Sequence, residues 1–218
     1  MTNTAKTPTA LKMAIRTAVI LFIFVISFTA LLSGAYIWTK PALEASAAEE
    51  KMKLIDEVLP RTAYDNELLK DTLRIPPSAV LGLDEASTVY RARKGRHASA
   101  LVLEAIAPDG YAGKIRLLVA IAADGTLAGV RVTQHKETPG LGDYIEPKKD
   151  KNRARPWITQ FNGLSLDTVS SREWKVKKDG GRFDSAVGAT VTPRAIIKAV
   201  HKAVQYAADH REQLYAAK

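Results

Sequence analysis

The chain has 218 residues and no cysteine, which excludes disulfides, cysteine-ligated iron–sulfur clusters and a c-type haem attachment site. Its length accommodates one membrane anchor and one domain of ordinary size. The formal net charge of +9 favours an anionic partner, which could be nucleic acid, anionic lipid or an acidic protein.

The N-terminal part of the sequence changes from basic to apolar. Residues 1–16 carry three cationic side chains and no acidic one, whereas residues 17–38 (TAVILFIFVISFTALLSGAYIW) carry no charge. As a helix, residues 17–38 would be about 33 Å long, enough to cross the hydrocarbon core of a membrane. The sequence therefore predicts a single-pass transmembrane helix in contact with lipid, which argues against a nucleic-acid partner.

The basic flank also predicts the orientation of this helix. Lys and Arg residues next to a transmembrane helix favour the cytoplasmic side, so residues 1–16 should be cytoplasmic and the residues after 38 should lie on the opposite side of the membrane. A cleaved signal peptide is the alternative, but its apolar region is normally only about 7–15 residues long. Residues 39–60, rich in Ala, Glu and Lys, predict a juxtamembrane helix or linker that ends at Pro60. Residues 61–218 are then expected to form one domain on that side.

Four segments in the first half of this domain have the composition of β-strands. The last two are joined by Asp124-Gly125, a strong hairpin signal. The strands are expected at residues 88–92, 101–107, 115–122 and 127–133. Residues 193–215 place apolar side chains at helical spacing and predict a long helix. We therefore expect an α+β domain in which helices pack on an antiparallel sheet.

A loop rich in proline and glycine follows the last strand, at residues 135–142 (HKETPGLG). Such a loop is tightly turned and can bring backbone N–H groups close to a flat ligand. His135 stands at its start, and a lone histidine is more often a hydrogen-bonding residue than a ligand. The four histidines show no spacing typical of metal ligands, so a metal site is not expected.

Two basic segments come next. Residues 148–155 (KKDKNRAR) form either a solvated loop or a surface that docks an acidic face of another subunit. Residues 174–182 contain four cations around Gly180-Gly181 and suggest a hairpin. One of those cations could balance a nearby phosphate.

The segment from Asp184 to Pro193 (DSAVGATVTP) combines a small-residue turn with the start of the long helix. Thr192 is the expected N-cap and Pro193 the expected first helical residue. A helix start favours a nearby anion, so the hydroxyl of Thr190 would lie beside a ready anion site. On these residues alone, the turn could be only a turn.

This segment resembles the flavinylation motif of FMN-binding domains, in which an Asp precedes Ser/Thr-Gly-Ala-Thr. The resemblance implies that FMN is joined through its phosphate to Thr190, with Asp184, Val187, Gly188 and Ala189 completing the motif. The chain has Val187 where that family usually has Ser or Thr. Residues 135–142 also resemble a second flavin-contacting loop of this family. That match adds five residues to the expected cofactor site: His135, Glu137, Thr138, Gly140 and Leu141.

Nearly the whole sequence resembles the G subunits of Rnf-type ion-translocating electron-transport complexes, and more distantly the C subunit of sodium-translocating NADH:quinone reductase. The resemblance implies a flavoprotein that relays electrons among other membrane subunits of an ion-translocating oxidoreductase. It also places the chain in the bacterial inner membrane, with residues 61–218 as a periplasmic domain. It also implies a separate flavin transferase that attaches the FMN, and no complete active site in this chain alone. The alternatives are a periplasmic scaffold without flavin and a free-standing periplasmic flavin reductase. The sequence lacks a Gly-x-Gly-x-x-Gly turn, which counts against independent NADH oxidation.

Overall fold

The computed structural model describes residues 10–186 and 188–216. The chain divides into two compact units, residues 1–49 and 50–218, which are described separately. The first consists of the long helix α1 (Ala10–Asp56), whose last turns belong to the second.

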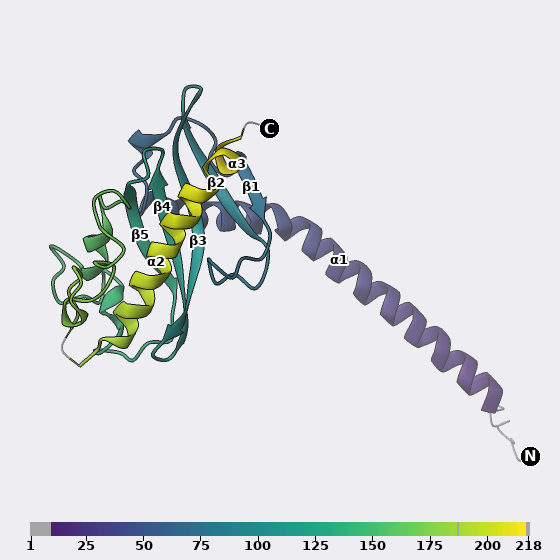
Figure 1. Cartoon of the computed structure of the whole chain (residues 1–218). Helices are drawn as coiled ribbons and strands as arrows, with labels where there is room; N and C mark the ends of the chain where they lie inside the picture. Colours follow the sequence, from purple (N-terminus) through teal and green to yellow (C-terminus); the bar gives the residue numbers. More distant parts are fainter. Residues whose placement is uncertain (1–9, 187, 217–218) are drawn as a thin grey trace, which may run out of the picture. The chain divides into compact units, whose positions relative to one another are not determined.

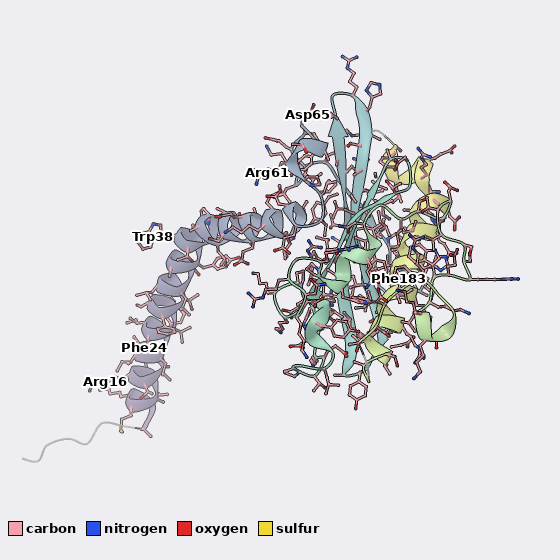
Figure 2. All side chains as sticks on the ribbon, turned by 90° about the vertical axis from the view of Figure 1, so that its left-hand side faces the viewer. Arg16, Phe24, Trp38, Arg61, Asp65 and Phe183 are labelled. Atoms are coloured by element: carbon pink, nitrogen blue, oxygen red, sulfur yellow. The ribbon has the colours of Figure 1, made fainter. Side chains whose placement is uncertain are left out.

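Helix α1 is long and apolar enough to cross a membrane, and no residue of its most apolar stretch is buried against protein. Large side chains such as Phe24 and Trp38 project from the ribbon without covering protein atoms (Figure 2). Exposed apolar side chains in such density need an apolar environment, which lipid provides. The helix runs through Pro41 without a break and ends at Asp56, four residues before the expected stop at Pro60.

The second unit is built on one antiparallel sheet with the strand order β1-β2-β3-β4-β5 (Figure 1). The strands are β1 (Thr72–Ile75), β2 (Ser87–Lys94), β3 (His97–Gly110), β4 (Gly113–Ala122) and β5 (Leu127–Gln134). Four of these strands and the Asp124-Gly125 hairpin confirm the sequence predictions. The short edge strand β1 was not predicted, because it has only four residues and ends directly before Pro76-Pro77.

Both faces of the sheet are buried, which explains why the central strands have apolar runs rather than strict alternation. Helix α2 (Val191–Asp209) covers one face, with Leu103 and Leu117 among the core residues beneath it. The end of α1 and the residues after it cover the other face, where Ile55 packs in a cluster with Val102. The α+β architecture expected from the sequence is therefore confirmed.

The C-terminal helical region is divided in two. Helix α2 ends at Asp209 and a short helix, α3 (Arg211–Tyr215), follows, whereas the sequence suggested one helix through residue 215. The segment 174–182 is not an antiparallel hairpin, which corrects that expectation. It contains a short 3₁₀ turn (Lys177–Asp179), and Val176 makes an isolated parallel bridge to Phe183. Gly180 has a φ of 78°, which turns the chain within this segment.

Candidate functional site

A cavity of about 240 Å³ lies at the start of α2 and joins three segments that are distant in the sequence. The β3–β4 turn, the loop after β5 and the residues that lead into α2 each contribute to it. Its lining residues are Tyr111, Glu137, Thr138, Leu141, Gly142, Gly188, Ala189, Thr190, Val191 and Thr192. Six of the residues expected from the sequence therefore lie together: Glu137, Thr138, Leu141, Gly188, Ala189 and Thr190.

Thr190 occupies the N-cap position of α2, but its side chain makes no capping hydrogen bond. Its backbone is in the helical region, with φ −101° and ψ −15°, so the hydroxyl does not turn back toward the helix N–H groups. The half-buried side chain instead accepts a hydrogen bond from Nη1 of Arg194, at 3.3 Å. The Thr190 hydroxyl can therefore gain a substituent without loss of a helix cap.

Arg194 is held in place by Asp179. Its Nε and Nη2 atoms donate to the two carboxylate oxygens of Asp179 at 2.6 and 2.7 Å, a bidentate pair. These hydrogen bonds lower the pKa of Asp179 and raise the pKa of Arg194. The guanidinium is thus a permanent, oriented positive charge beside the Thr190 hydroxyl.

Thr192 has a different role from the one that the sequence suggested. Helix α2 begins at Val191, so Thr192 is not the N-cap and Pro193 is not the first helical residue. The Thr192 side chain is buried, with only 2% of the residue exposed, and its hydroxyl donates to Oε2 of Glu137. Because the Thr192 hydroxyl is bonded and covered, Thr190 is the one of these two threonines at the start of α2 whose oxygen is available.

Glu137 connects the three segments of the site. Its carboxylate is buried, accepts from the Thr192 hydroxyl through Oε2 and accepts from the backbone N–H of Ala112 through Oε1 at 3.1 Å. Gly142 leaves room for this side chain, since a Cβ there would lie 3.0 Å from Oε2 of Glu137. A buried carboxylate with these partners positions the loop against the first turn of α2.

His135 lies outside the cavity at Thr190. Its Nδ1 accepts from the backbone N–H of Glu137 at 3.0 Å, and its Nε2 lies 2.5 Å from Oε1 of Glu146. The ring lines a separate cavity of about 550 Å³ beside Arg131. Within residues 10–186 and 188–216, no group of His, Asp and Glu side chains is arranged to hold a metal ion. The contacts of His135 are those of a residue that orients the loop.

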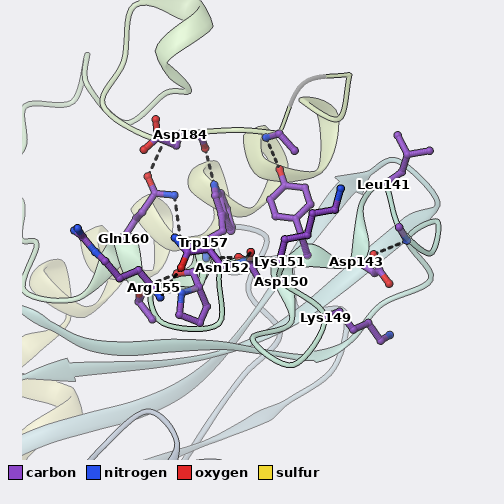
Figure 3. Close-up of a pocket in the computed structure, with 15 residues that line it drawn as sticks. Leu141, Asp143, Lys149, Asp150, Lys151, Asn152, Arg155, Trp157, Gln160 and Asp184 are labelled. Carbon is purple, nitrogen blue, oxygen red and sulfur yellow. Dashed lines mark hydrogen bonds between the residues drawn. The ribbon is translucent and has the colours of Figure 1, made fainter.

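Gly140 and Asp184 line a larger cavity of about 720 Å³ (Figure 3). Gly140 has a φ of 76° and donates its N–H to Asp143, so it shapes the turn that presents Leu141. The carboxylate of Asp184 pairs with Lys177 at 2.6 Å and not with any residue of the smaller cavity. Val187 lies outside the described residues.

Aromatic and amide side chains hold the segment that carries Thr190 in place by hydrogen bonds to its backbone groups. The indole Nε1 of Trp157 donates to the carbonyl of Asp184 at 2.5 Å, and the side chain of Gln160 accepts from the Asp184 N–H at 2.8 Å (Figure 3). The hydroxyl of Tyr144 donates to the carbonyl of Ala189 at 3.2 Å. Burial raises the pKa of Tyr144, so this hydroxyl stays protonated and able to donate.

The rim of the smaller cavity is unusually apolar for a surface. Tyr111 is 72% exposed, Leu141 54% and Val191 43%, and all three line the cavity. Exposed large apolar side chains gathered in one place indicate a binding site. A flat, partly apolar ligand beside Thr190 would cover them.

Sequence reasoning missed several of these residues. Arg194 could have been found from its position four residues after Thr190, which places the two on one face of a helix. Tyr111 could not, because only the sheet register brings the β3–β4 turn beside α2.

Comparisons with known proteins give a consistent result. The family model of the FMN-binding domain matches residues 110–205, which include every residue that lines the 240 Å³ cavity at Thr190. The chain is 44% identical over 202 residues to the G subunit of the ion-translocating oxidoreductase complex of Pseudomonas aeruginosa (strain UCBPP-PA14), covering 93% of this chain and 92% of the relative. It is 40% identical over 194 residues to the corresponding G subunit of Vibrio vulnificus (strain YJ016), covering 89% of each. It is also 38% identical to that of Aliivibrio fischeri (strain MJ11) over 200 residues, covering 91% of this chain and 92% of the relative.

Proposed function

Because this chain belongs to the family of G subunits of ion-translocating oxidoreductase complexes and has an FMN-binding domain, we propose that it carries one FMN joined to Thr190 and relays electrons within the complex. The attached FMN would supply the one- and two-electron redox chemistry that the protein side chains lack. The observation that carries the proposal is the Thr190 hydroxyl, which is uncapped, open to a cavity and beside a fixed guanidinium.

The residues around Thr190 fit a phosphate. Arg194 would donate to a phosphate oxygen, as it does to the Thr190 hydroxyl oxygen, and the start of the 19-residue helix α2 adds a favourable dipole. Arg194 donates to the Thr190 hydroxyl, whereas none of the four cations of segment 174–182 makes a described contact with it, so Arg194 replaces them as the expected counter-charge. The exposed rim of Tyr111, Leu141 and Val191 suits the flat flavin ring system.

The attachment step belongs to a separate flavin transferase. That enzyme would form the bond between Oγ1 of Thr190 and the FMN phosphorus, break the pyrophosphate bond of FAD and release AMP, while the hydroxyl proton passes to a base of the transferase. Thr190 would take no further part in chemistry. A covalent tether also makes the local cofactor concentration independent of free FMN, which suits a periplasmic domain.

The attachment is tested by mass spectrometry of the full-length chain, extracted from membranes of cells that contain the transferase. The tryptic peptide of residues 183–194 should carry the added FMN phosphoryl group, and fragmentation should place it on Thr190. The Thr190→Ala variant should lose the fluorescent band on a denaturing gel, whereas the matched Thr192→Val variant should keep it. An unmodified wild-type peptide would favour the scaffold without flavin.

The relay role is tested separately from attachment. Extraction in mild detergent should recover the flavin-bearing chain together with other membrane subunits. If the chain instead purified alone and oxidised a diffusible donor, it would be a free-standing flavin reductase.

We further propose that the domain faces the periplasm and that residues 1–16 stay in the cytoplasm. The absence of native cysteine makes this orientation simple to test. A single cysteine at the exposed position Ala79 should react with a membrane-impermeant maleimide in spheroplasts, whereas Thr4→Cys should react only after lysis. The reverse pattern would place the domain in the cytosol and exclude the proposed location.

A further inference from the structure

The loop at residues 148–155 concentrates positive charge next to the candidate site. It contains five cations, Lys148, Lys149, Lys151, Arg153 and Arg155, and one carboxylate, Asp150. All five cationic residues are exposed. The segment that follows turns inward at Trp157, which is buried.

The carboxylates near this loop already have partners and offset only part of its positive charge. Asp150 accepts from the backbone N–H groups of Asn152 and Trp157, at 2.8 and 2.6 Å. Glu146 accepts from Lys149 at 3.0 Å and also contacts His135. In the part of the chain that the structure describes, Lys148, Lys151, Arg153 and Arg155 therefore pair with no carboxylate.

The loop is also fixed in place. Asn152 accepts from the backbone N–H of Arg155 at 3.1 Å, and the indole of Trp157 donates to the carbonyl of Asp184. Figure 3 shows the link from the loop to the segment that leads to Thr190: the carboxylate of Asp150 accepts from the backbone N–H of Trp157, and the Trp157 indole donates to the backbone carbonyl of Asp184. A loop held in this way presents its charges at a low entropic cost to binding.

The same loop borders the candidate cofactor site. Lys149, Lys151 and Arg155 line the 720 Å³ cavity together with Asp184 and Ala186 of the attachment segment. Leu141 lines both this cavity and the smaller one at Thr190. A protein bound to the loop would thus lie within a few side chains of the cofactor.

We propose that residues 148–155 are the docking surface for an acidic face of the subunit that exchanges electrons with this chain. Four unpaired cations in a fixed arrangement complement a carboxylate-rich surface and would accelerate its association. The electron-exchange part of this inference rests on the proposed function, but the docking part does not. The segment KKDKNRAR has no large apolar side chain to insert into a bilayer, which favours a protein over anionic lipid.

The test reverses three of the unpaired charges in the full chain, within the membrane-extracted complex: Lys151→Glu, Arg153→Glu and Arg155→Glu together. The matched control reverses three exposed arginines that line none of the described cavities, Arg74→Glu, Arg96→Glu and Arg172→Glu. Both variants change the net charge equally. Flavin content by in-gel fluorescence, subunit retention and the rate of flavin reduction within the complex are measured for each, with a melting curve as the check of folding.

The loop variant should keep its flavin but lose partner subunits at low salt, and its flavin reduction should slow at least tenfold, whereas the control should match wild type. Wild type in high salt should reproduce the loop variant, which keeps the test informative if that variant folds poorly. Equal subunit retention and equal flavin reduction in the two variants would overturn the proposal. It would also be overturned if the loop variant kept its partner subunits but lost binding to anionic vesicles. If the wild-type chain carried no flavin, the proposed function would be refuted. Retention of partner subunits by the two variants would still test the docking proposal in that case.

Discussion

The guanidinium of Arg194 donates to the hydroxyl oxygen of Thr190 while it forms a bidentate ion pair with Asp179. One side chain thus connects a carboxylate in the 3₁₀ turn Lys177–Asp179 to the first turn of α2. The arrangement fixes a positive charge where the proposed phosphoester would form.

Arg194→Gln should lower the yield of covalent flavin about tenfold, because a charge-assisted hydrogen bond contributes roughly 1.5–3 kcal/mol. Arg194→Lys should retain part of the yield, since it keeps the charge but not the fork geometry. The measurement is flavin fluorescence per chain on a denaturing gel. Lys198→Gln is the matched control, because Lys198 lies one turn further along α2 and pairs with Asp109. Equal yields for Arg194→Gln and Lys198→Gln would contradict the prediction.

Glu137→Ala should destabilise the domain by about 2–4 kcal/mol, since it leaves the buried Thr192 hydroxyl and the Ala112 N–H without an acceptor. Thr192→Val should cost less, and the double variant should show less than the sum of the two single effects. Denaturant unfolding of the full chain in detergent measures the three free energies. Strict additivity would mean that the two side chains do not interact.

Gly129→Ala should destabilise the domain by about 1–3 kcal/mol, because the added Cβ would lie 2.5 Å from the carbonyl oxygen of Val58. That carbonyl belongs to backbone and cannot rotate away. Gly95→Ala is the comparison: its Cβ meets nothing within 4 Å, so only the cost of its φ of 59° applies. The melting temperature of Gly129→Ala should be lower than that of Gly95→Ala. The opposite order would exclude close packing at Gly129.

His201 should make the domain less stable in mild acid. Burial lowers the pKa of His201, whose ring stacks on Trp174 at 4.9 Å between centroids. The unfolded chain therefore binds a proton at a higher pH than the folded chain does. Stability should fall as pH drops below the unfolded value of about 6.5 and level off below the folded pKa.

The difference between wild type and His201→Phe isolates this contribution, since Phe keeps the stack on Trp174 but cannot titrate. Melting temperatures are measured for both proteins between about pH 5 and 8, where histidine titrates. The melting temperature of wild type should fall relative to that of His201→Phe as the pH decreases. Parallel pH profiles would show that His201 does not titrate in this range.

Local sequence signals determined much of this protein. An uncharged run at residues 17–38 dictates a helix that needs an apolar environment, and the Asp124-Gly125 turn with its flanking apolar runs dictates a hairpin. The apolar spacing after Pro193 dictates a helix with one buried face. Each of these three elements is determined by interactions between residues close together in the sequence, so the local sequence is sufficient to predict it. The resemblance of two segments, residues 135–142 and 184–193, to flavin-contacting segments of FMN-binding domains also indicated the cofactor site.

Tertiary structure alone decided how the hydroxyl of Thr192 is used. The sequence predicted Thr192 as the helix cap and Thr190 as the attachment residue, but the Thr192 hydroxyl instead donates to the buried carboxylate of Glu137, 55 residues away. The start of α2 shifted from Pro193 to Val191 for the same reason, because Thr192 satisfies its hydroxyl across the cavity and not along its own helix. A hydrogen bond between distant segments depends on the register of the sheet and the packing of the helix on it, and no local pattern of residues encodes either.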